Sequence, residues 1–92
     1  MKAAHLVITG RVQGVGYRDW MMKTARNLGL LGWVRNRIDD SVEALIAGDD
    51  AAVAAMIEAC RRGPSLARVD EVDVEPADAA GVPDGFTLRP TA

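Results

Sequence analysis

A length of 92 residues is typical of one domain, and we expect residues 1–92 to form it. Hydrophobic residues make up 49% of the chain and charged residues 26%, a balance that excludes an intrinsically disordered protein. The net charge of −2 argues against a nucleic-acid-binding surface, which usually needs a strongly basic domain, and no apolar run approaches the roughly 20 residues that span a bilayer.

The cysteine and histidine content and the first residues of the chain indicate which cellular compartment and which kinds of site to expect. The single cysteine, Cys60, cannot form an internal disulfide, which fits a reducing compartment. The first five residues show neither the apolar core nor the cleavage site of a signal peptide, so we expect a cytoplasmic protein. One histidine and one cysteine are too few for a zinc site built from these residues alone, and we expect neither a metal nor a cofactor.

The first third of the chain predicts a strand, a loop, a helix and a second strand. Apolar residues alternate over residues 3–12, which predicts a strand, and three glycines then mark residues 10–16 as a loop. From Tyr17 the apolar spacing changes to four, four and three, which predicts a helix that ends at Gly29. Residues 30–37 follow as a second strand.

The middle of the chain predicts a hairpin. Alternation along the second strand places Val34 and Asn36 on the same face. Asp39 and Asp40 form a turn into a third strand over residues 41–47.

The remainder predicts a second helix and two strands. Asp49 is suited to cap the helix, and Gly63 ends it. A fourth strand covers residues 66–75, and its apolar alternation slips between Val69 and Val72, which predicts a β-bulge. The last predicted segments are a solvated loop over residues 76–85 and a short fifth strand over residues 86–89. This order predicts an α+β fold, with an antiparallel sheet and both helices on one face.

The segment from residue 10 to residue 18 is the candidate phosphate-binding loop. Its members are Gly10, Arg11, Val12, Gln13, Gly14, Val15, Gly16, Tyr17 and Arg18. Glycines let such a loop aim several N–H groups at an anion, and the following helix points its positive end at the same place. That helix has no Ser, Thr, Asp or Asn cap, so its first N–H groups lack a partner. Arg18 can fold over the loop and hold two phosphate oxygens with its planar fork.

The distribution of charge along the chain agrees with a local anion site. The glycines alone do not distinguish such a site from a structural turn. Residues 1–40 carry a net charge of +4 and residues 41–92 a net charge of −6. The pattern fits neither GxxxxGK[ST] nor GxGxxG, and the glycines alone fit a tight strand-to-helix turn about as well. Asn36 alone is better explained as a residue that satisfies a strand end or a turn.

Two motifs at this spacing together resemble the acylphosphatase family. The first is GRVQGVGYR over residues 10–18, with Tyr17 where many members carry Phe, and the second is GWVRN over residues 32–36. Residues 63–70 and 86–91 also look like segments of that family. The resemblance spans nearly the full chain.

The resemblance implies a fold, a reaction and residue roles. The fold is a ferredoxin-like βαββαβ sandwich with a short fifth strand. The reaction is hydrolysis of acyl phosphates to carboxylate and inorganic phosphate by a positioned water, without a metal, a cofactor or a phosphoenzyme. Arg18 matches the residue that binds the phosphoryl group together with the loop amides, and Asn36 matches the residue that positions the water. The expected partners are a small-molecule acyl phosphate, and inorganic phosphate as product and inhibitor, for a monomer that binds neither nucleic acid nor membrane.

Elementary chemistry agrees with these roles. An acyl phosphate has a good leaving group, so positioning and charge stabilisation can supply most of the catalysis.

We expect Asp19 to face solvent or pair with a basic side chain, and Cys60 to lie in the core. Asp40 stands where the family commonly has glycine, and a positive φ there would cost roughly 1 kcal/mol.

Two other functions stay open at this point. A phosphate- or carbamoyl-phosphate-sensing module would bind without turnover, and the presence of both Arg18 and Asn36 favours an enzyme instead. An RNA-binding domain of the same fold needs aromatic residues on its central strands, and the first and third strands here have none.

Overall fold

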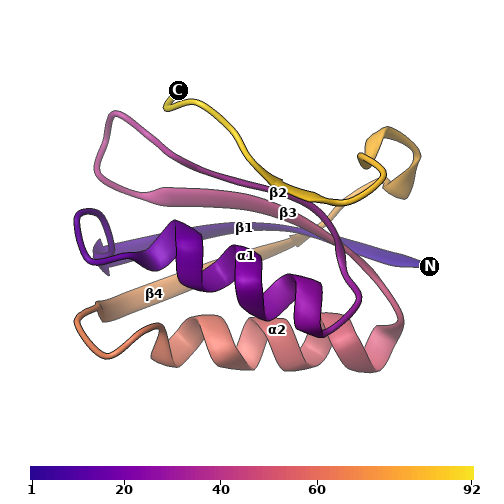
Figure 1. The fold of residues 1–92 in the computed structure, drawn as a ribbon, viewed down its shortest axis with the longest axis horizontal. Helices are drawn as coiled ribbons and strands as arrows, with labels where there is room; N and C mark the ends of the chain where they lie inside the picture. The colour runs from indigo at the N-terminus through magenta and orange to yellow at the C-terminus, as the bar shows by residue number, and fades with distance from the viewer.

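Residues 1–92 are all described by the computed structural model, in which two helices cover one face of a five-stranded sheet (Figure 1). The elements in chain order are β1 (Lys2–Arg11), α1 (Tyr17–Asn27), β2 (Leu31–Asn36), β3 (Val42–Gly48), α2 (Asp50–Arg62), β4 (Arg68–Pro76), a short 3-10 turn η1 (Ala79–Gly81) and β5 (Phe86–Leu88). The predicted α+β class, the element order and the single helical face are confirmed.

The sheet has the strand order β4-β1-β3-β2-β5. The first four strands pair antiparallel, whereas β5 pairs parallel to β2, so the short fifth strand makes the sheet mixed. The reason is geometric. The chain leaves β4 at one edge, crosses to the other edge at the same end of the sheet, and therefore enters β5 running opposite to β4.

The predicted bulge is present and shapes the end of β1. Thr9 pairs with Glu71 and Gly10 pairs with Val69, which leaves Asp70 as the extra residue on β4. Gly10 has φ 125°, and a Cβ there would collide with the backbone carbonyl of Arg68. The bulge therefore requires glycine at the point where β1 turns into the loop.

The core lies between the sheet and the helices. The apolar stripes of α1 and α2 contribute the fully buried side chains Met21, Ala25, Val53, Met56 and Cys60. Burial raises the pKa of the Cys60 thiol to about 11, which fits a packing role rather than a nucleophile.

Several sequence details can be compared with the structure. Asp40, in the turn between β2 and β3, adopts φ 74°, a positive φ whose need the sequence left open. Asp49 is the N-cap residue of α2, as predicted, although its side chain makes no capping hydrogen bond. No helix is long and apolar enough to cross a membrane.

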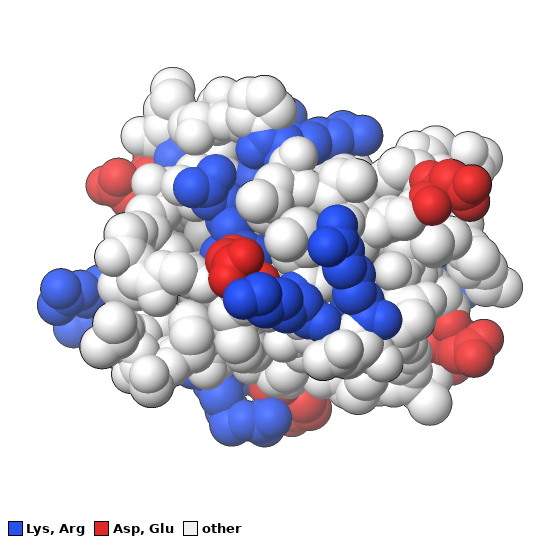
Figure 2. All heavy atoms as spheres, in the orientation of Figure 1, with Lys and Arg blue, Asp and Glu red and all other residues white.

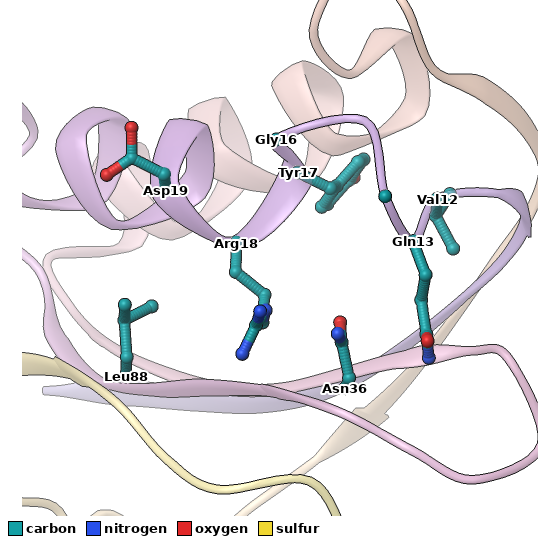
Figure 3. A pocket seen from close by; sticks show the side chains of 9 residues that line it. Val12, Gln13, Gly16, Tyr17, Arg18, Asp19, Asn36 and Leu88 are labelled. Carbon is teal, nitrogen blue, oxygen red and sulfur yellow. The ribbon is translucent and has the colours of Figure 1, made fainter.

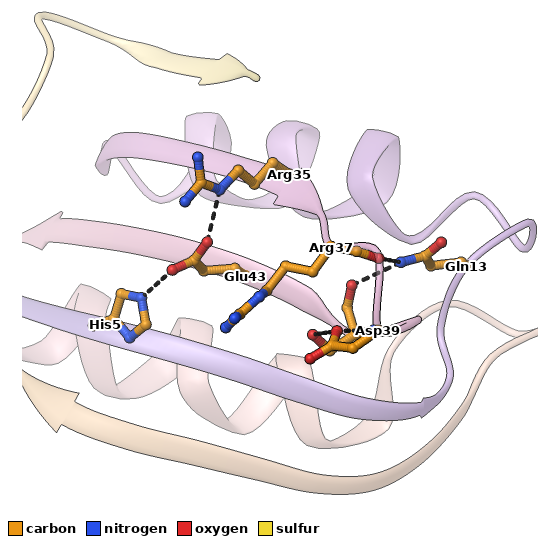
Figure 4. A network of polar contacts seen from close by, with 7 residues as sticks. His5, Gln13, Arg35, Arg37, Asp39 and Glu43 are labelled. Atoms are coloured by element: carbon orange, nitrogen blue, oxygen red, sulfur yellow. Dashed lines mark hydrogen bonds and ion pairs between the residues drawn. The ribbon is translucent and has the colours of Figure 1, made fainter. Parts of the chain in front are cut away.

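The face of the sheet away from the helices carries a polar network around Glu43 (Figure 4). The carboxylate of Glu43 lies 2.7 Å from His5 Nε2 and accepts a hydrogen bond from Arg35 Nε at 2.7 Å. Burial alone would raise the pKa of this carboxyl, but the hydrogen bonds from His5 and Arg35 outweigh burial and lower it.

Glu43→Gln should therefore destabilise the protein in a pH-dependent way. At pH 7 we expect the free energy of unfolding to fall by about 1.5–3 kcal/mol, because charge-assisted hydrogen bonds are lost. A pKa held below its ordinary value of 4.5 means that the ionised carboxyl stabilises the fold fully above pH 4.5 and loses this effect as pH falls further. Urea unfolding at several pH values should show the two proteins converging in acid. A difference that grows below pH 4.5 would contradict this account.

Candidate active site

A cavity of about 170 Å³ opens where the loop between β1 and α1 meets the end of β2 (Figure 3). Four sections of chain contribute to it: the loop, the first turn of α1, the last residue of β2 and the last residue of β5. The lining residues are Val12, Gln13, Gly14, Gly16, Tyr17, Arg18, Asp19, Asn36 and Leu88.

Two glycines shape the part of the loop that borders this cavity. Gly14 and Gly16 have φ values of 73° and 80°, a left-handed conformation that favours glycine. Gly16 is the N-cap of α1 and no side chain caps the helix, so the first N–H groups of α1 have no capping partner. A helix N-terminus with open N–H groups beside a glycine turn is suited to bind an anion.

Arg18 and Asn36 point toward one another across the cavity (Figure 3). Val34 faces the core, so strand alternation turns Asn36 to the same face, just beyond the start of α1. Neither side chain forms a hydrogen bond or ion pair with another residue of the chain. Both polar groups are therefore available to a ligand.

Asp19 contributes the only carboxylate among the lining residues, and it is turned away. Its side chain points out from the cavity (Figure 3) and pairs with Lys23 at 2.9 Å. This confirms the expected pairing with a basic residue. No group of three or more His, Cys, Asp or Glu side chains comes together in a set that could hold a metal ion.

Six of the nine predicted loop residues line the cavity: Val12, Gln13, Gly14, Gly16, Tyr17 and Arg18. Gly10, Arg11 and Val15 do not line the cavity. The side chains of Val12 and Tyr17 are buried in the core; the hydroxyl of Tyr17 donates to the backbone carbonyl of Cys60 at 2.7 Å, and burial raises the pKa of this phenol above its ordinary value.

Among the predicted loop residues that line the cavity, Gln13 and Arg18 have polar side chains. Gln13 donates both of its hydrogen bonds from Nε2 to backbone carbonyls, those of Arg37 and Ser41, each at 2.8 Å (Figure 4).

Leu88 was not predicted as a site residue, because the sequence gives no signal that β5 joins the sheet beside β2.

Positive side chains lie along α1, on the helical face. Figure 2 shows Lys and Arg side chains gathered over the middle of this face, where α1 lies, with acidic groups mostly toward the margins. Helix α1 supplies Arg18, Lys23 and Arg26. This charge should raise the local concentration of anionic ligands.

The fold and this site can now be compared with known proteins. The sequence model of the acylphosphatase family matches residues 4–88. The chain belongs to the acylphosphatase family. It is a hydrolase, and its substrates are small-molecule acyl phosphates.

Individual acylphosphatases show how close the similarity is. The acylphosphatase of Acidiphilium cryptum (strain JF-5) is 54% identical over 91 residues, which cover 99% of each chain. That of Rhodopseudomonas palustris (strain BisB5) is 62% identical over 84 residues, 91% of this chain and 81% of the relative. The crystal structure of acylphosphatase from Bacillus subtilis superposes with a TM-score of 0.92 at 32% identity, covering 97% of this chain and 99% of that one.

Proposed function

We propose that this acylphosphatase binds the phosphoryl group of its substrate between Arg18 and the loop amides, while Asn36 aligns the attacking water. One observation carries the proposal: Arg18 and Asn36, from different elements and without partners in the chain, meet in a cavity bordered by the uncapped N-terminus of α1. The guanidinium and the amides supply positive charge for the phosphoryl oxygens.

The reaction follows from this placement. The water oxygen forms a bond to phosphorus, and the bond from phosphorus to the bridging oxygen breaks. The carboxylate leaves with the electron pair, and the proton released by the water ends on the inorganic phosphate. Because a carboxylate is a good leaving group, no acid has to protonate it, which agrees with a cavity whose single carboxylate is turned outward.

Further parts of the proposal concern how the protein works as a whole. Residues 1–92 are proposed to act as one domain, as a cytoplasmic monomer without a metal or cofactor and without a nucleic-acid or membrane partner.

The test of the reaction class is turnover of a simple acyl phosphate compared with an alkyl phosphate monoester, each with and without excess chelator. The acyl phosphate should be cleaved at the same rate in chelator, and the monoester hardly at all. Comparable rates on both substrates would exclude the proposed mechanism.

Inorganic phosphate should inhibit competitively and raise the melting temperature, because it binds at the same loop in the folded state alone. At 100 times its dissociation constant the gain in stability would be about 2.7 kcal/mol. Thermal melts with a phosphate titration measure this, and Arg18→Ala should shift less at equal phosphate concentrations. A melting temperature that ignores phosphate up to high millimolar concentrations would argue against the assigned anion site.

A further inference from the structure

Gln13 connects two parts of the site that are far apart in the chain. It belongs to the loop that approaches the cavity from β1, whereas its two hydrogen-bond acceptors lie in the turn between β2 and β3. One acceptor is the carbonyl of Arg37, the residue that directly follows Asn36. The other is the carbonyl of Ser41, which also accepts the backbone N–H of Arg37 at 2.9 Å.

These contacts use all the N–H groups that a glutamine side chain has. A primary amide carries two N–H hydrogens on one nitrogen, and here both face backbone carbonyls. The side chain of Gln13 therefore has no N–H left to donate to a phosphate in the cavity.

The turn that accepts the hydrogen bonds of Gln13 is itself stabilised by further hydrogen bonds. Asp39 accepts hydrogen bonds from the backbone N–H of Ser41 at 3.0 Å and from its hydroxyl at 2.6 Å, and Ser41 is buried. On the other side of β2, Ala92 donates its N–H to the carbonyl of Asn36 at 3.1 Å. Gln13 thus ties the loop to a turn that other contacts already fix.

We infer that Gln13 is a positioning residue, which fixes the distance between the phosphate-binding loop and the amide of Asn36. The inference rests on the proposed function, in which the loop holds phosphorus and Asn36 holds the water. Without the connection the loop amides and Arg18 can still bind phosphate, but the water is no longer held in line with it. A misplacement of about 1 Å in such a geometry can lower a rate by up to about 10²-fold.

The test is a double-mutant cycle between Gln13→Met and Asn36→Ala. Methionine keeps the length of the side chain and removes both donors. Gln13→Met alone should lower kcat by about 10- to 100-fold, with the phosphate dissociation constant changed by less than about threefold. In the Asn36→Ala background the same substitution should lower kcat by less than about threefold, because the group that Gln13 positions is already gone. Gln13→Ala, which removes both donors together with most of the side chain, provides a second variant for the same cycle.

His5→Ala is the matched control, since it removes a contact between strands on the opposite face of the sheet and should leave kcat unchanged. A Gln13→Met variant with normal kcat would overturn the inference, and so would a full loss that persists in the Asn36→Ala background. If Asn36→Ala itself kept normal turnover, the proposed role of Asn36 would fail first, which separates the two outcomes.

Discussion

Replacing Arg18 with lysine should lower the turnover of an acyl phosphate by about 10³-fold or more, nearly as far as replacing it with alanine. Lysine keeps the positive charge but offers a compact ammonium on a flexible stem, so it cannot hold two phosphoryl oxygens in the plane of a fork. The expectation rests on where Arg18 lies: in the first turn of α1, aimed into the cavity, with no other side-chain partner to restrain or replace it.

Turnover, phosphate affinity and melting temperature of Arg18→Lys and Arg18→Ala together decide this. Both variants should stay folded, because the Arg18 side chain makes no hydrogen bond or ion pair within the chain and packs at the cavity rather than in the core. Both should also bind inorganic phosphate more weakly than the unchanged protein. Near-normal turnover with lysine would show that charge suffices, and near-normal turnover with alanine would remove Arg18 from the mechanism.

Asn36→Ala should lower turnover by about 10²- to 10³-fold, by comparison with the loss of one positioned amide donor in other hydrolases. Phosphate affinity should barely change, because the proposed contact of Asn36 is with the water rather than with the phosphoryl group. Asn36 lies at the end of β2, and its backbone is held by neighbours on both sides, so removing the side chain should leave the strand in place.

Steady-state kinetics and phosphate titrations on Asn36→Ala measure the two effects separately. His5→Ala is again the matched control, because it changes the other face of the same sheet. A variant with normal turnover and weakened phosphate binding would mean that Asn36 holds the anion, and the roles assigned here would have to be exchanged.

Local patterns were sufficient to predict the elements, whereas the pairing of Arg18 with Asn36 as site residues came from the resemblance to the acylphosphatase family. The change from alternating to helical spacing at Tyr17 marks the start of α1, and alternation from buried Val34 explains why Asn36 faces the helical side. The slip in apolar pattern between Val69 and Val72 correctly placed the bulge. Each of these depends on neighbours within a few positions along the chain.

What the sequence could not predict depends on contacts between distant segments. No local pattern shows that the side-chain donors of Gln13, a residue of the predicted phosphate-binding loop, meet carbonyls 24 and 28 positions away. Leu88 enters the cavity wall only because β5 joins the far edge of the sheet beside β2. The Glu43 network likewise joins three strands whose register no local pattern reveals.

Hydrolysis of an acyl phosphate in ¹⁸O-labelled water tests most directly whether the group held by the loop and Arg18 is the one that reacts. If a water beside Asn36 attacks phosphorus, the labelled oxygen should appear in the released inorganic phosphate and the carboxylate should stay unlabelled. Mass spectrometry of both products reports this in a single experiment. Label in the carboxylate would mean attack at the acyl carbon, and would contradict the mechanism proposed for this site.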